Sequence, residues 1–72
     1  MQGAELREIR SEMGWTLHDM ALVLGMSGNF ISMMERGERP IERRTALAVR
    51  YIKNINDTLA EGVTINEALA DD

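Results

Sequence analysis

The sequence contains no cysteine, one histidine, one proline and one each of tryptophan, tyrosine and phenylalanine. Without cysteine, the chain can form neither a disulfide nor a thiolate metal site. The single histidine, His18, has no second nitrogen or sulfur ligand near it, so we expect no metal and no cofactor. No apolar run approaches the roughly 20 residues of a membrane span. The segment MQGAELREIR also lacks the basic and then apolar order of a signal peptide, and we expect a cytoplasmic protein without membrane contact.

The groups that carry out enzymatic reactions are equally scarce. The sequence shows no glycine-rich loop for phosphates and no set of carboxylates that would converge in a pocket. We therefore expect a binding protein rather than an enzyme. The 72 residues are interpreted as one domain, because a chain of this length has room for only one small core. Small chains of this kind often gain stability by forming oligomers.

Charge is distributed unevenly along the chain, whose formal net charge is −4. Residues 57–72 contain five acids and no base, whereas residues 36–53 contain six bases and two acids. A local basic face beside an acidic tail is compatible with binding to phosphates. Ordinary solvated helix surfaces remain the alternative interpretation of these charges.

The most informative stretch is residues 16–36, TLHDMALVLGMSGNFISMMER, which favours two short helices joined by a tight turn. Gly25 can adopt the positive φ that ends the first helix, and Ser27 can cap the second. Thr16 and Asp19 have the spacing of a capping box for the first. The spacing of the apolar residues is typical of a helix-turn-helix, and they are Met20, Leu24, Met26, Ile31 and Met34.

From Leu6 to about Ile52, the chain resembles the Cro and lambda-repressor family of DNA-binding proteins. The features in register with that family are LREIR, the GWT lead-in at residues 14–16, the A-x3-G spacing from Ala21 to Gly25, Ser27, IS at residues 31–32 and ERGERP at residues 35–40. The resemblance implies an all-α, compact five-helix domain. We expect its helices over residues 4–13, 17–24, 28–36, 41–59 and 65–70.

The resemblance also implies a structural ion pair between Arg10 and Glu35, for which the planar arginine fork suits a carboxylate better than lysine would. The sequence departs from the family at Leu17, where glutamine is frequent and touches DNA. We expect helix 17–24 to lack that contact.

The outward side of helix 28–36 contains the candidate base contacts, which are Gly28, Asn29, Ser32 and Met33. Asn29 can pair bidentately with adenine, Ser32 can donate or accept, and Met33 can lie against a thymine methyl. An exposed Met33 is also typical of a protein contact. The candidate phosphate contacts are Ser27, Arg36, Arg39, Arg43 and Arg44.

Helix 41–59 contains two apolar stripes. Leu47 and Tyr51 form one stripe, and the other consists of Ile41, Ala48, Ile52, Ile55 and Leu59 at heptad-like spacing. One stripe is expected to complete the core and the other to meet a partner, which in the resembled family is usually a second copy. The alternatives are one wide core face and a break near Asn54, Asn56 and Asp57. The predicted dimer interface comprises Ile52, Ile55, Leu59, Ile65 and Leu69.

The sequence therefore predicts a sequence-specific regulator that binds double-stranded DNA as a homodimer, more readily a repressor than an activator. A protein-interaction module of the same fold is the competing hypothesis. Leu17, Met33, the few bases in helix 28–36 and the acidic tail favour that alternative.

Overall fold

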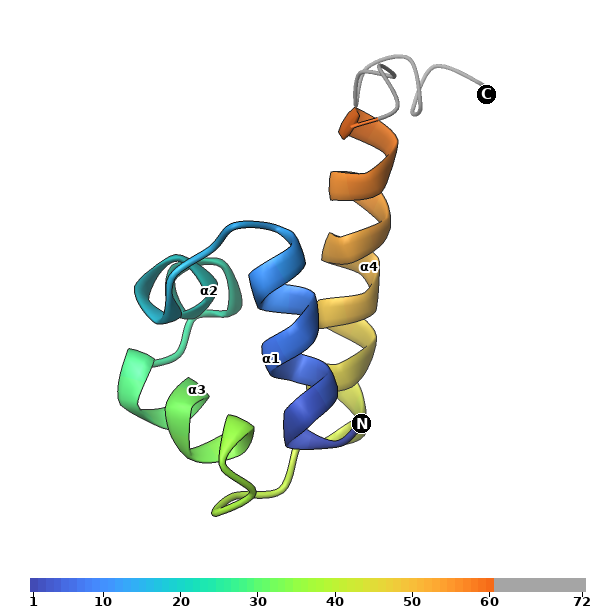
Figure 1. The fold of residues 1–72 in the computed structure, drawn as a ribbon. Coiled ribbons are helices and arrows are strands. Elements are labelled where there is room, and N and C mark those ends of the chain that lie inside the picture. The colour runs from blue at the N-terminus through green and yellow to red at the C-terminus, as the bar shows by residue number, and fades with distance from the viewer. Residues whose placement is uncertain (61–72) are drawn as a thin grey trace.

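The computed structural model describes residues 1–60, and these are all-α (Figure 1). The helices are α1 (Gly3–Glu12), α2 (Leu17–Leu24), α3 (Gly28–Glu35) and α4 (Arg43–Ala60). The all-α prediction is confirmed, whereas five helices are not, because the helix expected over 65–70 lies outside the described residues. No helix within residues 1–60 is long and apolar enough to span a membrane.

Helix α2 begins and ends through local interactions that the sequence predicts. Thr16 Oγ1 accepts a hydrogen bond from the Asp19 amide at 3.1 Å, and Asp19 Oδ2 accepts one from the Thr16 amide at 2.9 Å. This reciprocal pair is a capping box, and the bond from the Thr16 amide lowers the pKa of Asp19. Gly25 ends the helix with φ +69°, in the left-handed region that favours glycine. Both predictions for this helix are confirmed.

Helix α4 begins at Arg43 rather than near residue 41, and Pro40 lies in the connection before it, as expected. It ends at Ala60, one residue beyond the expected end. The carbonyl of Glu42 accepts a hydrogen bond from the Ala46 amide at 2.9 Å, which fixes the start of the helix. The helix then continues through Asn54 and Asp57 without a break. Lys53 Nζ lies 2.8 Å from Asp57 Oδ2, one helical turn along, and supports this segment.

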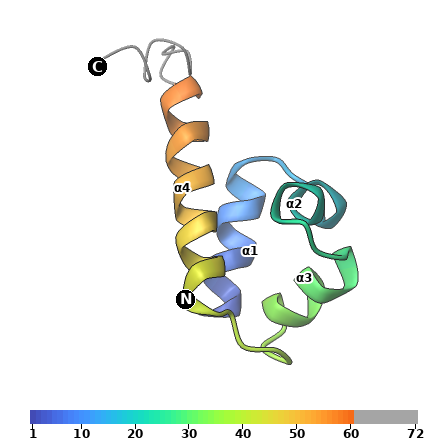
Figure 2. The same ribbon diagram turned by 180° about the vertical axis from the view of Figure 1, so that it is seen from behind.

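The core lies where α1, α2 and α3 meet, and one side of α4 covers it (Figures 1 and 2). Its buried members are Leu6, Ile9, Met20, Ala21, Ile31, Met34 and Val49. Trp15, Leu24, Met26 and Phe30 pack against this cluster at its edge.

Of the two apolar stripes predicted here, the second contributes Ile41, just before α4, to the edge of the core, but neither stripe contains the most buried residues of α4. The buried residues in the first half of α4 are Thr45, Ala46 and Val49, which belong to neither stripe. Leu47 and Tyr51 are 55% and 64% exposed and therefore contribute little to the core.

The start of α1 lies directly against the end of α3. A Cβ atom built on Gly3 would lie 2.5 Å from the carbonyl oxygen of Glu35 and would also meet that of Met34. No flexible side chain can yield at this point, because both obstacles are backbone. Glycine is therefore required at Gly3 by close packing between helices rather than by its φ.

We predict that Gly3→Ala destabilises the protein by about 1 to 3 kcal/mol, because α1 must move away from α3. Gly28→Ala is the matched control, since Gly28 is also the first residue of a helix and its added Cβ would meet nothing nearer than 4.0 Å. Chemical denaturation of both variants measures the difference. Equal stabilities would contradict the close contact.

Candidate nucleic-acid interface

Helix α3 presents one polar side to solvent. Asn29 and Arg36 are exposed on it, and Ser32 and Met33 are half-buried. Gly28 is half-buried because it lies beside Leu17, which itself packs on the core. The opposite side of the helix is anchored in the core by Ile31 and Met34. The polar side is therefore held in a fixed orientation.

The start of α3 is capped by Ser27, whose Oγ accepts a hydrogen bond from the Phe30 amide at 3.1 Å. The Ser27 hydroxyl hydrogen can still be donated outward, because a hydroxyl both accepts and donates. The first amides of a helix are also good donors to an anion. This end of α3 can therefore bind a phosphate oxygen.

Arg10 and Glu35 connect α1 to α3 through a bidentate ion pair. Arg10 Nε lies 2.6 Å from Glu35 Oε2, and Arg10 Nη2 lies 3.1 Å from Glu35 Oε1. Arg10 Nη1 also donates to the carbonyl oxygen of Trp15 at 2.8 Å. The side chains retain only 17% and 8% exposure, and the hydrogen bonds to Glu35 raise the pKa of Arg10. One guanidinium thus joins α1, the connection before α2 and the end of α3.

Arg36 does not extend freely into solvent. Its Nη1 donates to Ser32 Oγ at 2.7 Å, and its Nε donates to the carboxylate of Glu38. Arg36 and Glu38 are 55% and 54% exposed, so the pair remains accessible to a ligand. The hydrogen bond lowers the pKa of Glu38 and raises that of Arg36.

Three further arginines follow α3 along the chain. Arg39 is exposed in the connection, and Arg43 and Arg44 are exposed in the first turn of α4. That turn contains no acid. Cations at a helix N-terminus oppose the helix dipole, so these positions do not favour arginine for helix stability. A bound anion would compensate for the unfavourable placement.

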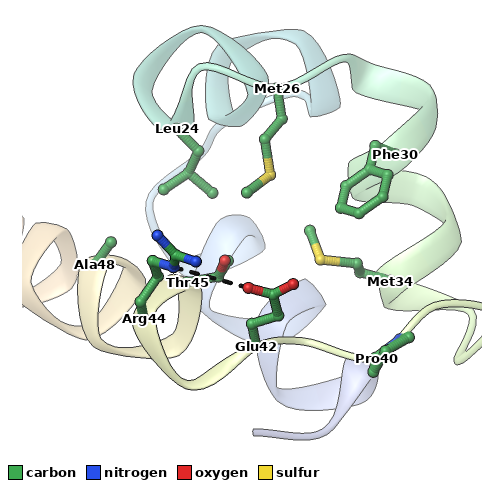
Figure 3. Close-up of a pocket in the computed structure, with 9 residues that line it drawn as sticks. All are labelled: Leu24, Met26, Phe30, Met34, Pro40, Glu42, Arg44, Thr45 and Ala48. Carbon is green, nitrogen blue, oxygen red and sulfur yellow. Dashed lines mark ion pairs between the residues drawn. The ribbon is translucent and has the colours of Figure 1, made fainter.

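A groove of about 360 Å³ separates this basic turn from α2 and α3 (Figure 3). It is lined by Leu24, Met26, Phe30, Met34, Pro40, Glu42, Arg44, Thr45 and Ala48. Arg44 and Glu42 form a loose ion pair at its edge, with Nε and Oε2 separated by 3.8 Å. The groove exists because α4 directs the small side chains of Thr45 and Ala48 toward larger residues of α2 and α3.

Three of the five residues predicted to form a dimer interface lie in the second half of α4, whose end projects beyond α1, α2 and α3 (Figures 1 and 2). Ile52 and Ile55 are half-buried, and Leu59 is 46% exposed. Ile65 and Leu69 lie outside the described residues. Arg50, nearer the middle of α4, lies 3.7 Å from Glu5 of α1.

The short helices, the capped turn between α2 and α3 and the exposed side of α3 define a helix-turn-helix protein. Residues 3–50 match the sequence profile of the helix-turn-helix domain family, and the chain belongs to that family. This membership is consistent with the resemblance to the Cro and lambda-repressor family. Searches of curated proteins and of solved structures gave no match. A helix-turn-helix domain is typical of DNA-binding regulators, which are not usually enzymes, and it suggests DNA as the partner.

Sequence reasoning missed Gly3 and Glu38. Nothing in the sequence indicates that the backbone of α3 approaches Gly3. The signal for Glu38 was available, because Arg36 and Glu38 carry opposite charges on either side of Gly37. Gly37 has φ +78°, and the turn there brings the two side chains together.

We predict that Glu35→Gln lowers the free energy of unfolding by about 2 kcal/mol, because it leaves the partly buried Arg10 without an opposite charge. Arg7→Gln is the control, because Arg7 lies in α1 like Arg10 but is exposed. This substitution should change the free energy of unfolding by less than about 0.5 kcal/mol. Urea denaturation measures both. The double variant Arg10→Gln/Glu35→Gln should lose less than the sum of the single losses. Additive losses would argue against the coupling.

Proposed function

We propose that this protein is a sequence-specific transcriptional regulator that binds double-stranded DNA through α3 and acts as a homodimeric repressor. The observation that supports this most is the row of exposed arginines Arg39, Arg43 and Arg44 directly after α3. Two of them occupy a helix N-terminus, where they oppose the helix dipole. Phosphates flanking a major groove would provide further anions beside Glu42, whose carboxylate lies 3.8 Å from Arg44.

In this proposal α3 enters the major groove and the arginines bind the flanking backbone. Asn29 pairs with an adenine, and Ser32 and Met33 meet neighbouring base edges. Gly28 allows the start of α3 to approach the DNA closely. Ser27, Arg36, Arg39, Arg43 and Arg44 are the proposed phosphate contacts.

A homodimer would place two copies of α3 in successive major grooves. Two-fold symmetry then requires an inverted repeat whose half-sites are separated by about one turn of DNA. Ile52, Ile55 and Leu59 belong to the second half of α4, whose end projects beyond the other helices of the described part, and this placement supports the arrangement. We propose that Ile65 and Leu69 belong to the same interface. Repression would be steric, since the bound dimer occupies DNA that the polymerase needs.

The proposal is tested by measuring binding to the DNA upstream of the protein's own gene over a series of salt concentrations, with random DNA as competitor. Sequence-specific binding should resist the competitor and weaken steeply as salt rises, because phosphate contacts release counterions. Binding that shows no preference at low salt would contradict the proposal.

Two variants separate base contacts from phosphate contacts in the same assay. Asn29→Ala should relax base choice at one position of each half-site, with a loss of about tenfold or more on the preferred site. Arg43→Ala should weaken all sequences alike and reduce the salt slope by about 1. Equal losses on specific and random DNA from both variants would overturn these assignments.

The dimer is tested separately with Ile55→Asp. A charge in the proposed interface should shift the protein to monomers in analytical ultracentrifugation and weaken binding to an inverted repeat. Leu47→Asp is the matched control, because Leu47 is an exposed apolar residue on another side of the same helix. Circular dichroism verifies that both variants are folded. If Ile55→Asp stays dimeric while Leu47→Asp dissociates, the interface lies on the other side of α4.

A protein-interaction module remains the second candidate. Two features favour it. One is the groove that separates α4 from α2 and α3. The other is the pair Leu22 and Val23 on α2, which are 68% and 52% exposed. Leu17 is a weaker argument than the sequence suggested, because it packs on the core. Apolar docking would persist at a salt concentration that abolishes phosphate contacts, so the same salt series distinguishes the two functions.

A further inference from the structure

The exposed side of α3 has little positive charge for a helix that is proposed to bind DNA. Residues 28–35 contain no lysine or arginine, and the nearest cation along the chain is Arg36, at the C-cap. The sequence alone places this residue at the far end of the helix, where a phosphate contact is the simplest assignment. The structure gives its side chain a different place.

Arg36 folds back along α3 instead of extending from its end. Its Nη1 donates to Ser32 Oγ at 2.7 Å, and Ser32 lies one helical turn closer to Asn29. The guanidinium is therefore carried toward the middle of the exposed side, among the residues proposed to meet bases. The positive charge that the helix lacks in sequence is supplied there by conformation.

Glu38 holds the guanidinium in this position from the other side. Its carboxylate accepts from Nε, while Ser32 accepts from Nη1. Within residues 1–60, these two bonds leave three of the five N–H donors of Arg36 for a ligand, one on Nη1 and two on Nη2. The guanidinium plane is thus oriented by two anchors, and an oriented fork loses less conformational entropy when it binds.

The carboxylate also changes which ligand this arginine suits. A phosphate attracts net positive charge, and Glu38 offsets the charge of Arg36 while repelling a phosphate nearby. Binding to a base edge instead depends on hydrogen-bond geometry. Guanine presents two acceptors, O6 and N7, to the major groove, and an arginine fork matches both.

We propose that Arg36 reads a guanine in the major groove, with Glu38 and Ser32 as the residues that position it. This inference rests on the proposed DNA-binding function and replaces the phosphate role of Arg36 within it. Glu38 itself contacts no base. Its effect is to convert a flexible cation at the helix end into a directed donor pair at the helix centre.

The test is selection of preferred sites from randomised duplex DNA by the wild-type protein and by Arg36→Lys, Glu38→Gln and Arg7→Lys. Arg36→Lys keeps the charge and removes the planar fork, so it should lose the preference for guanine at one position by about tenfold. Its affinity for random DNA should stay within about twofold of the wild type. Arg7→Lys, the control at an exposed arginine of α1 that has no proposed DNA contact, should select the wild-type site.

Glu38→Gln removes the anchor while leaving Arg36 intact. It should weaken the same guanine preference and, because one acid is lost, strengthen binding to random DNA. A merely structural role for Glu38 would leave base choice unchanged. Thermal unfolding of each variant verifies that these exposed substitutions leave the fold intact.

Each outcome decides between the assignments. If Arg36→Lys selects the wild-type site, Arg36 binds a phosphate and the inference is wrong, although the protein still binds specific DNA. If Glu38→Gln strengthens binding to all sequences and keeps the guanine preference, Glu38 does not position Arg36. If the wild-type protein selects no sequence, the proposed function fails together with this inference.

Discussion

The bidentate pair between Arg10 and Glu35 is the constraint on which the arrangement of this small protein depends. Helix α3 has only eight residues, too few to be stable alone, so its direction is set by what it touches. Its core side chains determine how deeply it is buried, and the pair fixes its far end against α1. The same guanidinium holds the carbonyl of Trp15 and so fixes the entry into α2. A helix oriented in this way can present the same polar side in every molecule.

The distribution of charge in this protein differs from what its net charge suggests. The chain is acidic overall, yet exposed arginines cluster from the end of α3 to the first turn of α4. The helix dipole disfavours Arg43 and Arg44 where they stand. At the C-cap of α3, the two anchors of Arg36 restrict the cation nearest to that helix. In the proposed DNA complex, the arginines after α3 would provide broad attraction, and Arg36 would provide directed hydrogen bonds.

Much of the fold was predictable from the sequence because its signals are local. The capping box at Thr16 and the left-handed Gly25 depend on residues only a few positions apart. The packing side of α4 was not predictable in this way, since periodicity shows that apolar stripes exist and not which side packs. Thr45 and Ala46 face inward because small residues allow close approach, which no hydrophobic pattern reveals. The anchoring of Arg36 was missed because it depends on how a turn folds back, and contacts with DNA remain predictions.

The composition of the core has a consequence for how this protein can vary. Within the described residues, six of the seven members of the central cluster come from α1, α2 and α3, and α4 contributes Val49. The part that carries the polar side of α3 therefore has a nearly self-contained interior. Substitutions along the projecting half of α4 can accumulate without disturbing that interior. During evolution, such a protein could change the projecting half of α4, and with it its partner, while the polar side of α3 stays the same. It could equally change the polar side of α3 while keeping its partner.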